Sequence, residues 1–207
     1  MVQIYENAVN DIIMAGNRLD GQNFAPATSG NYSIRVGDNE MAITVSGVHK
    51  GQLEPRHIMR ADLDGNSLDG KTPSAETLLH CLIYKLCPDI NAVLHTHSVA
   101  CSVLTKVMAN ARELVLSGYE MLKAYPNITT HDIVVSLPIF ENTQDMIELS
   151  SLVNDYLKEF PKTPAFLIRC HGVYGWGADM NEAMRVIEAT ETLMSIEVNI
   201  KQIGNKI

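Results

Sequence analysis

Residues 73–98 read PSAETLLHCLIYKLCPDINAVLHTHS, and this stretch decides the fold. Its apolar side chains recur at intervals of three and four, which predicts a helix that opens at Pro73 and closes at Cys87. The apolar run 90–94 follows and predicts a short buried strand, which ends where the polar residues 95–98 begin. A helix that leads directly into a buried strand favours a layered α/β domain.

The rest of the chain continues this mixture of helices and strands. Further helices are predicted at residues 5–19, 99–108 and 143–160, and from residue 179 onward. Strands are predicted at residues 32–36, 41–45, 58–63, 113–116, 133–139, 165–169 and 173–176. No repeat or linker divides the sequence, so we expect one α/β domain over residues 1–207, built on one central sheet whose strand order stays open.

The composition is that of an acidic globular protein. Hydrophobic residues make up 46% of the 207 residues and charged residues 19%, which is enough apolar material to bury a core. The net charge of -8 has the wrong sign for general binding to nucleic acids or anionic membranes. The N-terminal stretch lacks a secretory signal pattern, and no apolar run approaches the length of a bilayer span. We therefore expect a cytoplasmic protein that binds neither nucleic acid nor membrane.

The cysteines fit the same compartment. The chain has four of them with no CxxC spacing, and a chain of this size does not need disulfides to fold. We expect reduced thiols that pack as small buried side chains: Cys81, Cys87, Cys101 and Cys170.

Three histidines lie where predicted strands end. Side chains two apart on an extended segment point to the same face, so His95 and His97 can reach one ion. This pair alone is a weak motif, and two polar residues at a strand end is the competing interpretation. His171 follows a second apolar strand and can close on the same end of the sheet. Three imidazoles are the ligand set of a catalytic zinc that leaves one position for substrate.

Two carboxylates are candidates for proton transfer beside such an ion. Glu76 lies in the first turn of the helix predicted from Pro73, where an ordinary helix cap is the alternative at even odds. Glu120 lies in the segment GYEMLKA, and spacing alone favours a solvated surface charge there. Local pattern does not decide between these roles.

Small donors around glycines allow a site for an anion. They occur at residues 28–31, at residues 44–50 and at Ser74, next to a predicted helix start. Glycine lets backbone N–H groups approach a phosphate, and hydroxyl groups, an amide and the helix dipole add to the attraction. Each piece alone is also typical of a turn, but together they allow a phosphate site without a Walker-type loop.

Seven segments occur in an order and spacing that resemble the class II aldolase/adducin-head family: PATSGNYSIR, ITVSGVHKG, PSAETLLH, AVLHTHS, GYEMLKA, PIFEN and HGVYGWG. The resemblance covers nearly the whole chain. It implies a single three-layer α/β domain with a central, largely antiparallel sheet flanked by helices, assembled as a homotetramer with sites near subunit interfaces. It also implies a small phosphorylated ketose as substrate.

The resemblance assigns roles to individual residues. It implies one Zn²⁺ per subunit on His95, His97 and His171, and Glu120 as general acid/base. Glu76 falls where aldolases of the family place a carboxylate that binds the metal or moves a proton. Phosphate would bind near Gly30, Asn31, Ser46, Gly47, Lys50 and Ser74. One departure is Cys170, where we expect glycine, asparagine or arginine before the HG pair.

GYEM followed by PIFEN points within the family to a branch of hydro-lyases, which dehydrate their substrate. One alternative is a sugar-phosphate aldolase or epimerase of the fuculose- or ribulose-phosphate type, which shares the metal and phosphate sites. Another is a non-catalytic binding module like the adducin head. Retention of three histidines and two carboxylates argues against the binding module.

Overall fold

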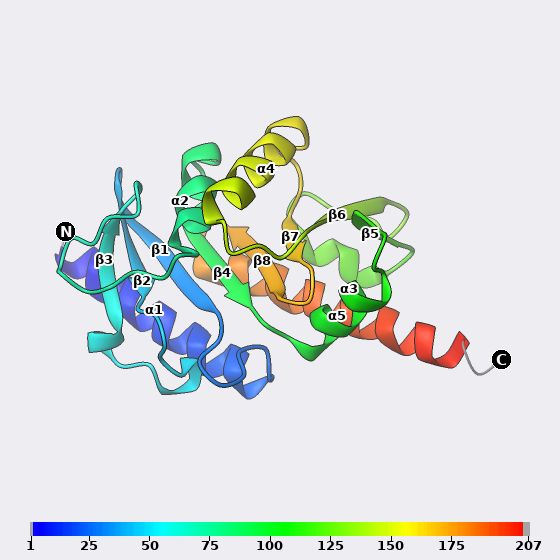
Figure 1. Ribbon diagram of the computed structural model, residues 1–207, viewed down its shortest axis with the longest axis horizontal. Helices are drawn as coiled ribbons and strands as arrows, with labels where there is room; N and C mark the ends of the chain where they lie inside the picture. The colour runs from blue at the N-terminus through cyan, green and yellow to red at the C-terminus, as the bar shows by residue number, and fades with distance from the viewer. Residues whose placement is uncertain (1, 205–207) are drawn as a thin grey trace.

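The computed structural model describes residues 2–204 and has one central sheet with helices on both of its faces (Figure 1). The α-helices are α1 (Val2–Gly21), α2 (Thr77–Leu86), α3 (Val99–Val107), α4 (Met146–Glu159) and α5 (Met180–Gly204). The strands are β1 (Asn31–Gly37), β2 (Glu40–Thr44), β3 (Ile58–Asp62), β4 (Ala92–Thr96), β5 (Glu113–Ser117), β6 (Val134–Phe140), β7 (Ala165–Ile168) and β8 (Gly172–Gly177). Short 3-10 helices occur at η1 (Lys50–Gln52), η2 (Pro55–His57) and η3 (Glu120–Ala124).

The strand order is β3-β2-β1-β4-β8-β7-β6-β5 among the described residues. Neighbouring strands are antiparallel except β6 and β7, so the sheet is largely antiparallel, as the resemblance implies. The N-terminal half of the sheet meets the C-terminal half where β4 pairs with β8. This seam joins segments about 80 residues apart in sequence, and it carries the candidate site.

Alternating side chains of the strands build two cores. Ala42 and Leu94 pack with α1, α3 and α5 on one face, whereas Met41, Ile43 and Val93 pack with α2 and α4 on the other face. This is the period of two expected of strands that are buried on both sides. The result is the predicted three-layer α/β arrangement, with α5 lying along the back of the sheet in Figure 1.

Most predicted elements are present, but two boundaries that bear on the site differ. The helix predicted to open at Pro73 begins at Thr77, with Glu76 as its N-cap residue. The strand predicted to end at residue 94 continues to Thr96, because the ladder with β8 extends to the pair formed by Thr96 and Val173. Within residues 2–204, no helix combines the length and apolar character needed to cross a membrane.

Candidate metal centre

The seam between β4 and β8 brings the three histidines together. His95 is the fourth residue of β4, and His97 follows that strand with its backbone N–H donating to the carbonyl of Phe24 at 2.8 Å. His171 lies in the tight turn between β7 and β8. Because β4 and β8 are antiparallel, the end of one lies beside the start of the other, and the structure brings His95, His97 and His171 together.

The turn that carries His171 depends on unusual backbone at both of its neighbours. A Cβ atom on Gly172 would lie 1.9 Å from the carbonyl oxygen of Thr96, so only glycine lets β8 approach β4 this closely. Cys170 has φ +54°, in the left-handed region that favours glycine and asparagine. This explains why a residue other than cysteine is expected there. Cys170 is also exposed, so its predicted burial is wrong, whereas Cys81 and Cys101 are buried.

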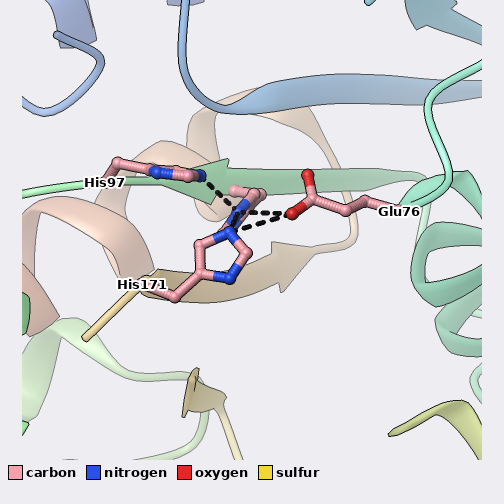
Figure 2. A group of neighbouring side chains, drawn as sticks. Glu76, His97 and His171 are labelled. Carbon is pink, nitrogen blue, oxygen red and sulfur yellow. Dashed lines mark hydrogen bonds and ion pairs between the residues drawn. The ribbon is translucent and has the colours of Figure 1, made fainter. Parts of the chain in front are cut away.

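Glu76 completes the cluster from the other side of the seam (Figure 2). Its Oε1 atom lies 2.9 Å from Nε2 of His171 and 3.6 Å from Nε2 of His95. The alternative of a capping carboxylate is wrong, because the Glu76 side chain makes no hydrogen bond to the start of α2. Instead, the N-cap position places the side chain at the edge of the sheet, where it reaches the imidazoles.

The four donor atoms have the spacing of a tetrahedral metal site. The Nε2 atom of His95 lies 2.9 Å from that of His97 and 3.4 Å from that of His171, and all four ligand atoms lie within 4.8 Å of one another. Tetrahedral zinc with bonds of about 2.05 Å requires donors roughly 3.3 Å apart. The residues present therefore fit a four-coordinate divalent ion with little movement.

Hydrogen bonds fix which imidazole nitrogens carry lone pairs. Nδ1 of His95 donates to the carbonyl of Val173 at 2.9 Å, and Nδ1 of His171 donates to Oδ1 of Asn142 at 3.2 Å. Both Nε2 atoms are then free to bind a metal. Burial is the main cause that lowers the pKa of His97 to about 3, so this imidazole is neutral. Lone pairs that converge at these distances repel one another unless a cation lies between them.

Glu76 is ionised in this cluster. Burial raises the pKa of its carboxyl group, but the neighbouring His171 and His95 outweigh burial and hold the pKa far below its usual range. This ionised carboxylate lies where the three imidazoles converge. A divalent cation is the ligand that this charge favours.

Sequence reasoning missed two residues that support the ligands. Asn142 is the last residue of the PIFEN segment, and its side chain orients His171. Tyr174 stacks on the His95 ring with centroids 4.1 Å apart and planes at 14°. The signal for Tyr174 was available, since it directly faces His95 in the β4 and β8 ladder, but this pairing cannot be read from one strand alone.

Glu120 occupies a different place. It is the first residue of η3, its side chain is 68% exposed, and it pairs with Lys123 at 2.6 Å and with His131 at 2.9 Å. Hydrogen bonding by Lys123 lowers the pKa of Glu120. Over residues 2–204, the cluster of possible metal ligands holds Glu76 and the three histidines and does not include Glu120.

The candidate phosphate residues lie on both sides of β1. Ser46 and Gly47 are exposed, while Gly30 is partly buried with φ +78° beside the carbonyl of His95. Lys50 is buried, and its Nζ atom donates to the carbonyls of Thr28 at 3.0 Å and Val48 at 2.7 Å. Burial lowers the pKa of Lys50 to about 8.

Two other candidates for phosphate contact Glu76 instead. The Asn31 side chain donates from Nδ2 to Oε2 of Glu76 at 2.5 Å, and the Ser74 hydroxyl accepts the backbone N–H of Glu76 at 3.3 Å. Both residues therefore link the predicted phosphate region to the metal cluster. Asn31 keeps a second N–H on the same nitrogen for another acceptor.

Comparison with known proteins gives a consistent result. The family described as Class II Aldolase and Adducin N-terminal domain matches residues 10–198. The chain is 47% identical over 197 residues to the methylthioribulose-1-phosphate dehydratase of Pseudomonas syringae pv. syringae, covering 95% of this chain and 96% of that protein. It is 48% identical over 196 residues to the enzyme of the same name from Pseudomonas aeruginosa strain LESB58, covering 94% and 95%.

The fold is also similar to solved structures. L-fuculose-1-phosphate aldolase from Thermus thermophilus superposes with a TM-score of 0.77 at 22% identity, covering 99% of this chain and 97% of that chain. At this identity the likeness concerns the fold alone. It agrees with the three-layer arrangement and largely antiparallel sheet described above.

Proposed function

The chain belongs to the class II aldolase and adducin N-terminal domain family, and we propose that it is a hydro-lyase that dehydrates 5-methylthioribulose 1-phosphate to 2,3-diketo-5-methylthiopentyl 1-phosphate. The observation that carries the proposal is the convergence of three imidazoles and an ionised carboxylate on one point. Two relatives at 47% and 48% identity, matched over nearly their whole length, carry the name of this activity. We further propose a role in methionine salvage in the cytoplasm.

We propose Zn²⁺, one per subunit, as the ion. Imidazole and carboxylate donors at tetrahedral spacing support zinc over magnesium or calcium, which prefer oxygen ligands at higher coordination number. When bound, zinc would polarise the C2 carbonyl of the substrate and make the proton on C3 more acidic. His95, His97 and His171 hold the ion in this proposal, and Glu76 would give up the fourth position to the substrate's carbonyl oxygen.

The reaction removes one water molecule. The C3–H bond breaks and its electron pair forms the C3–C4 double bond, while the C4–O bond breaks and the hydroxyl leaves with a proton. The resulting enol loses the proton of its C3 hydroxyl and takes a proton at C4, which gives the diketone. A carboxylate that accepts the C3 proton can return a proton to the leaving hydroxyl. One general acid/base can therefore serve both the removal of the C3 proton and the loss of the C4 hydroxyl.

We assign that general acid/base to Glu120, supplied by a neighbouring copy of the chain. Its exposed side chain and its separation from the cluster within one chain support this assignment. Exposed apolar side chains lie near it in sequence, among them Met121 at 41% exposure and Val134 at 64%. Burying them against a second copy would bring Glu120 to another subunit's metal, in the proposed homotetramer. Glu76, already at the metal, would instead orient the ion and substrate.

We propose that the substrate's phosphate binds near Gly30, Asn31, Ser46, Gly47, Lys50 and Ser74. The exposed Ser46 and Gly47 offer donors on the open side of β1. Asn31 offers its second N–H. Lys50 contributes positive charge, and its ammonium group is held by the carbonyls of Thr28 and Val48.

The test is a direct assay with 5-methylthioribulose 1-phosphate. We expect formation of the diketone by the purified protein, its loss after chelation, and its return when zinc is added. The same samples are incubated with fuculose 1-phosphate and ribulose 5-phosphate, and the products are scored as diketone, aldehyde or epimer. Aldehyde or epimer without diketone would overturn the proposal in favour of an aldolase or epimerase, and no product with any ketose would favour a binding module.

A further inference from the structure

Polar side chains from one face of α2 and from one face of β1 form a buried row that starts at Glu76. We call it the polar row. Glu76, His80 and Tyr84 are spaced by four along α2, so they lie on one side of the helix. Asn31 and Ser33 are spaced by two on β1 and point to the same side of the sheet. The two sets interdigitate, although the rest of this interface is apolar.

These five side chains form a continuous chain of hydrogen bonds. Oε2 of Glu76 and Nδ2 of Asn31 are 2.5 Å apart, and Oδ1 of Asn31 and Nε2 of His80 are also 2.5 Å apart. Nδ1 of His80 lies 2.7 Å from Oγ of Ser33, which lies 2.8 Å from the hydroxyl of Tyr84. This series of hydrogen bonds runs from the metal cluster into the protein interior.

Each bond in this chain has only one possible direction. Asn31 presents its nitrogen to Glu76 and its oxygen to His80. His80 must then donate from Nε2, which leaves a lone pair on Nδ1. Ser33 donates its single proton to Nδ1, and Tyr84 donates to Ser33. All four hydrogen bonds are thus satisfied when His80 carries its proton on Nε2.

Burial keeps this arrangement constant around neutral pH. His80 and Ser33 are fully buried, and Tyr84 and Asn31 are 1% and 4% exposed. Burial, with a smaller contribution from His95, lowers the pKa of His80 to about 3, and burial raises the pKa of Tyr84 well above its usual value. His80 is therefore neutral and Tyr84 keeps its proton, so none of these donors is lost at neutral pH.

We propose that His80 is a positioning residue for the metal centre, acting through Asn31 on Glu76. A free carboxylate can rotate and present either oxygen to a cation. Asn31 occupies Oε2, so Oε1 is the oxygen that faces His95 and His171. His80 is what keeps the Asn31 amide from turning over, because the reversed amide would set two donors against each other at 2.5 Å. The proposal rests on the metal site of the proposed function and adds the residue that aims its carboxylate.

The experiment compares two substitutions at one position. His80→Phe keeps a flat ring of similar size and removes the donor, whereas His80→Gln keeps an N–H where Nε2 lies. The measurement is the dissociation constant for Zn²⁺ of the full-length chain, obtained by competition with a chelator. Loss of a residue that orients metal ligands weakens metal binding by roughly 10- to 100-fold. We expect that loss in His80→Phe and an affinity within about threefold of the original in His80→Gln.

Two further variants separate positioning from a general effect on stability. Leu157→Ala opens a cavity in the same core from α4, away from the polar row, and should lower the melting temperature while leaving zinc affinity unchanged. Asn31→Ala cuts the link between His80 and Glu76 and should weaken zinc binding as His80→Phe does. The double variant Asn31→Ala, His80→Phe should lose no more than Asn31→Ala alone, because one chain of hydrogen bonds carries both effects.

Several outcomes would overturn the proposal. It fails when a folded His80→Phe binds zinc as tightly as the original, when His80→Gln is as defective as His80→Phe, or when the two losses in the double variant add. Should His80→Phe not fold, an unchanged zinc affinity in Asn31→Ala overturns the proposal equally. Zinc affinity is measured without substrate, so absence of dehydratase activity in the unsubstituted protein would remove the proposed function and leave this test intact.

Discussion

Glu76 and Glu120 are the same chemical group placed in opposite settings. The Glu76 side chain is 18% exposed and is held on one oxygen by Asn31, while its other oxygen faces two imidazoles. The Glu120 side chain is 68% exposed and is held by Lys123 and His131 at the surface. Both carboxyl groups have lowered pKa values, Glu76 because the neighbouring His171 and His95 outweigh burial and Glu120 through its bond with Lys123.

The difference distinguishes a site that one chain forms by itself from a site that needs a second copy of the chain. The buried carboxylate has every partner it needs within residues 2–204, and those partners fix its direction. The exposed carboxylate has flexible, solvated partners, which contribute little to a fixed geometry. We therefore expect the metal site to be complete in each subunit and the proton-transfer group to be completed by contact between copies.

The largest expected effect comes from removing a metal ligand. His97→Ala removes one of the three imidazoles and breaks the tetrahedral arrangement of the donors, so we expect loss of bound metal and, with it, of most turnover. Elemental analysis and the dehydration assay measure the two effects. His131→Ala, which removes an exposed histidine outside the cluster, should keep its zinc. Full metal occupancy in His97→Ala would show that the cluster is not the metal site.

Glu120→Gln should affect turnover and spare the metal. Glutamine keeps the size and hydrogen bonding of the side chain but cannot accept a proton, so we expect turnover to fall by roughly a hundredfold to ten-thousandfold. Zinc content and the Michaelis constant should change little, because Glu120 lies outside the cluster. Glu159→Gln, at the exposed end of α4, is the control. Near-normal turnover in Glu120→Gln would place the general acid/base elsewhere, with Glu76 as the first residue to test.

Mixing the two variants tests where Glu120 acts. His97→Ala and Glu120→Gln chains are each inactive alone, but a mixed assembly pairs an intact metal site with an intact Glu120 from its neighbour. Random mixing of equal amounts should restore about one quarter of the sites when the carboxylate crosses between subunits. Mixed assemblies that stay inactive would mean that each site uses its own Glu120.

Much of this comparison could be predicted from the sequence, because the metal ligands follow local rules. His95 and His97 are two apart at a strand end and His171 follows another strand, so period and position were enough to group them. Strand order was not predictable, since the pairing of β4 with β8 is set by contacts across about 80 residues. The start of α2 was also missed, because Pro73 is a common first residue of a helix but here lies ahead of it.

The supporting residues were harder to predict for a physical reason. A sequence shows the spacing of His80 and Glu76 along a helix, but it does not show that Asn31 on a distant strand lies between them. The same holds for Asn142, whose contact with His171 depends on the parallel pairing of β6 and β7. The role of Glu120 rests on the family resemblance, and nothing in its local pattern distinguishes it from a surface charge.

A third carboxylate sharpens the comparison, and it gives the smallest expected effect. Glu191 on α5 is fully buried directly behind the metal ligands, where its Oε1 atom accepts the Thr96 hydroxyl at 2.6 Å. Within the described chain, its Oε2 atom has no hydrogen-bond partner. Burial raises the pKa of Glu191 to about 7, against smaller opposing effects of Ser98 and Thr96. Its neighbours Tyr32 and Cys101 have pKa values raised by burial, so they stay neutral.

Glu191→Gln should therefore change how stability depends on pH. The folded protein binds this proton more tightly than the unfolded chain, whose carboxyl pKa is near the ordinary value of 4.5, so stability is lost as the pH rises from about 4.5 to about 7. The loss is on the order of 3 kcal/mol by pH 8. Glutamine stays neutral, so the variant should melt several degrees higher than the original at pH 8 and almost equally at pH 5. Melting is measured with chelator present, which keeps metal release out of the comparison, and Glu159→Gln serves as the exposed control. Parallel curves for Glu191→Gln and the original would mean that this buried carboxylate is ionised, as Glu76 is, and would require a cation or proton donor near it.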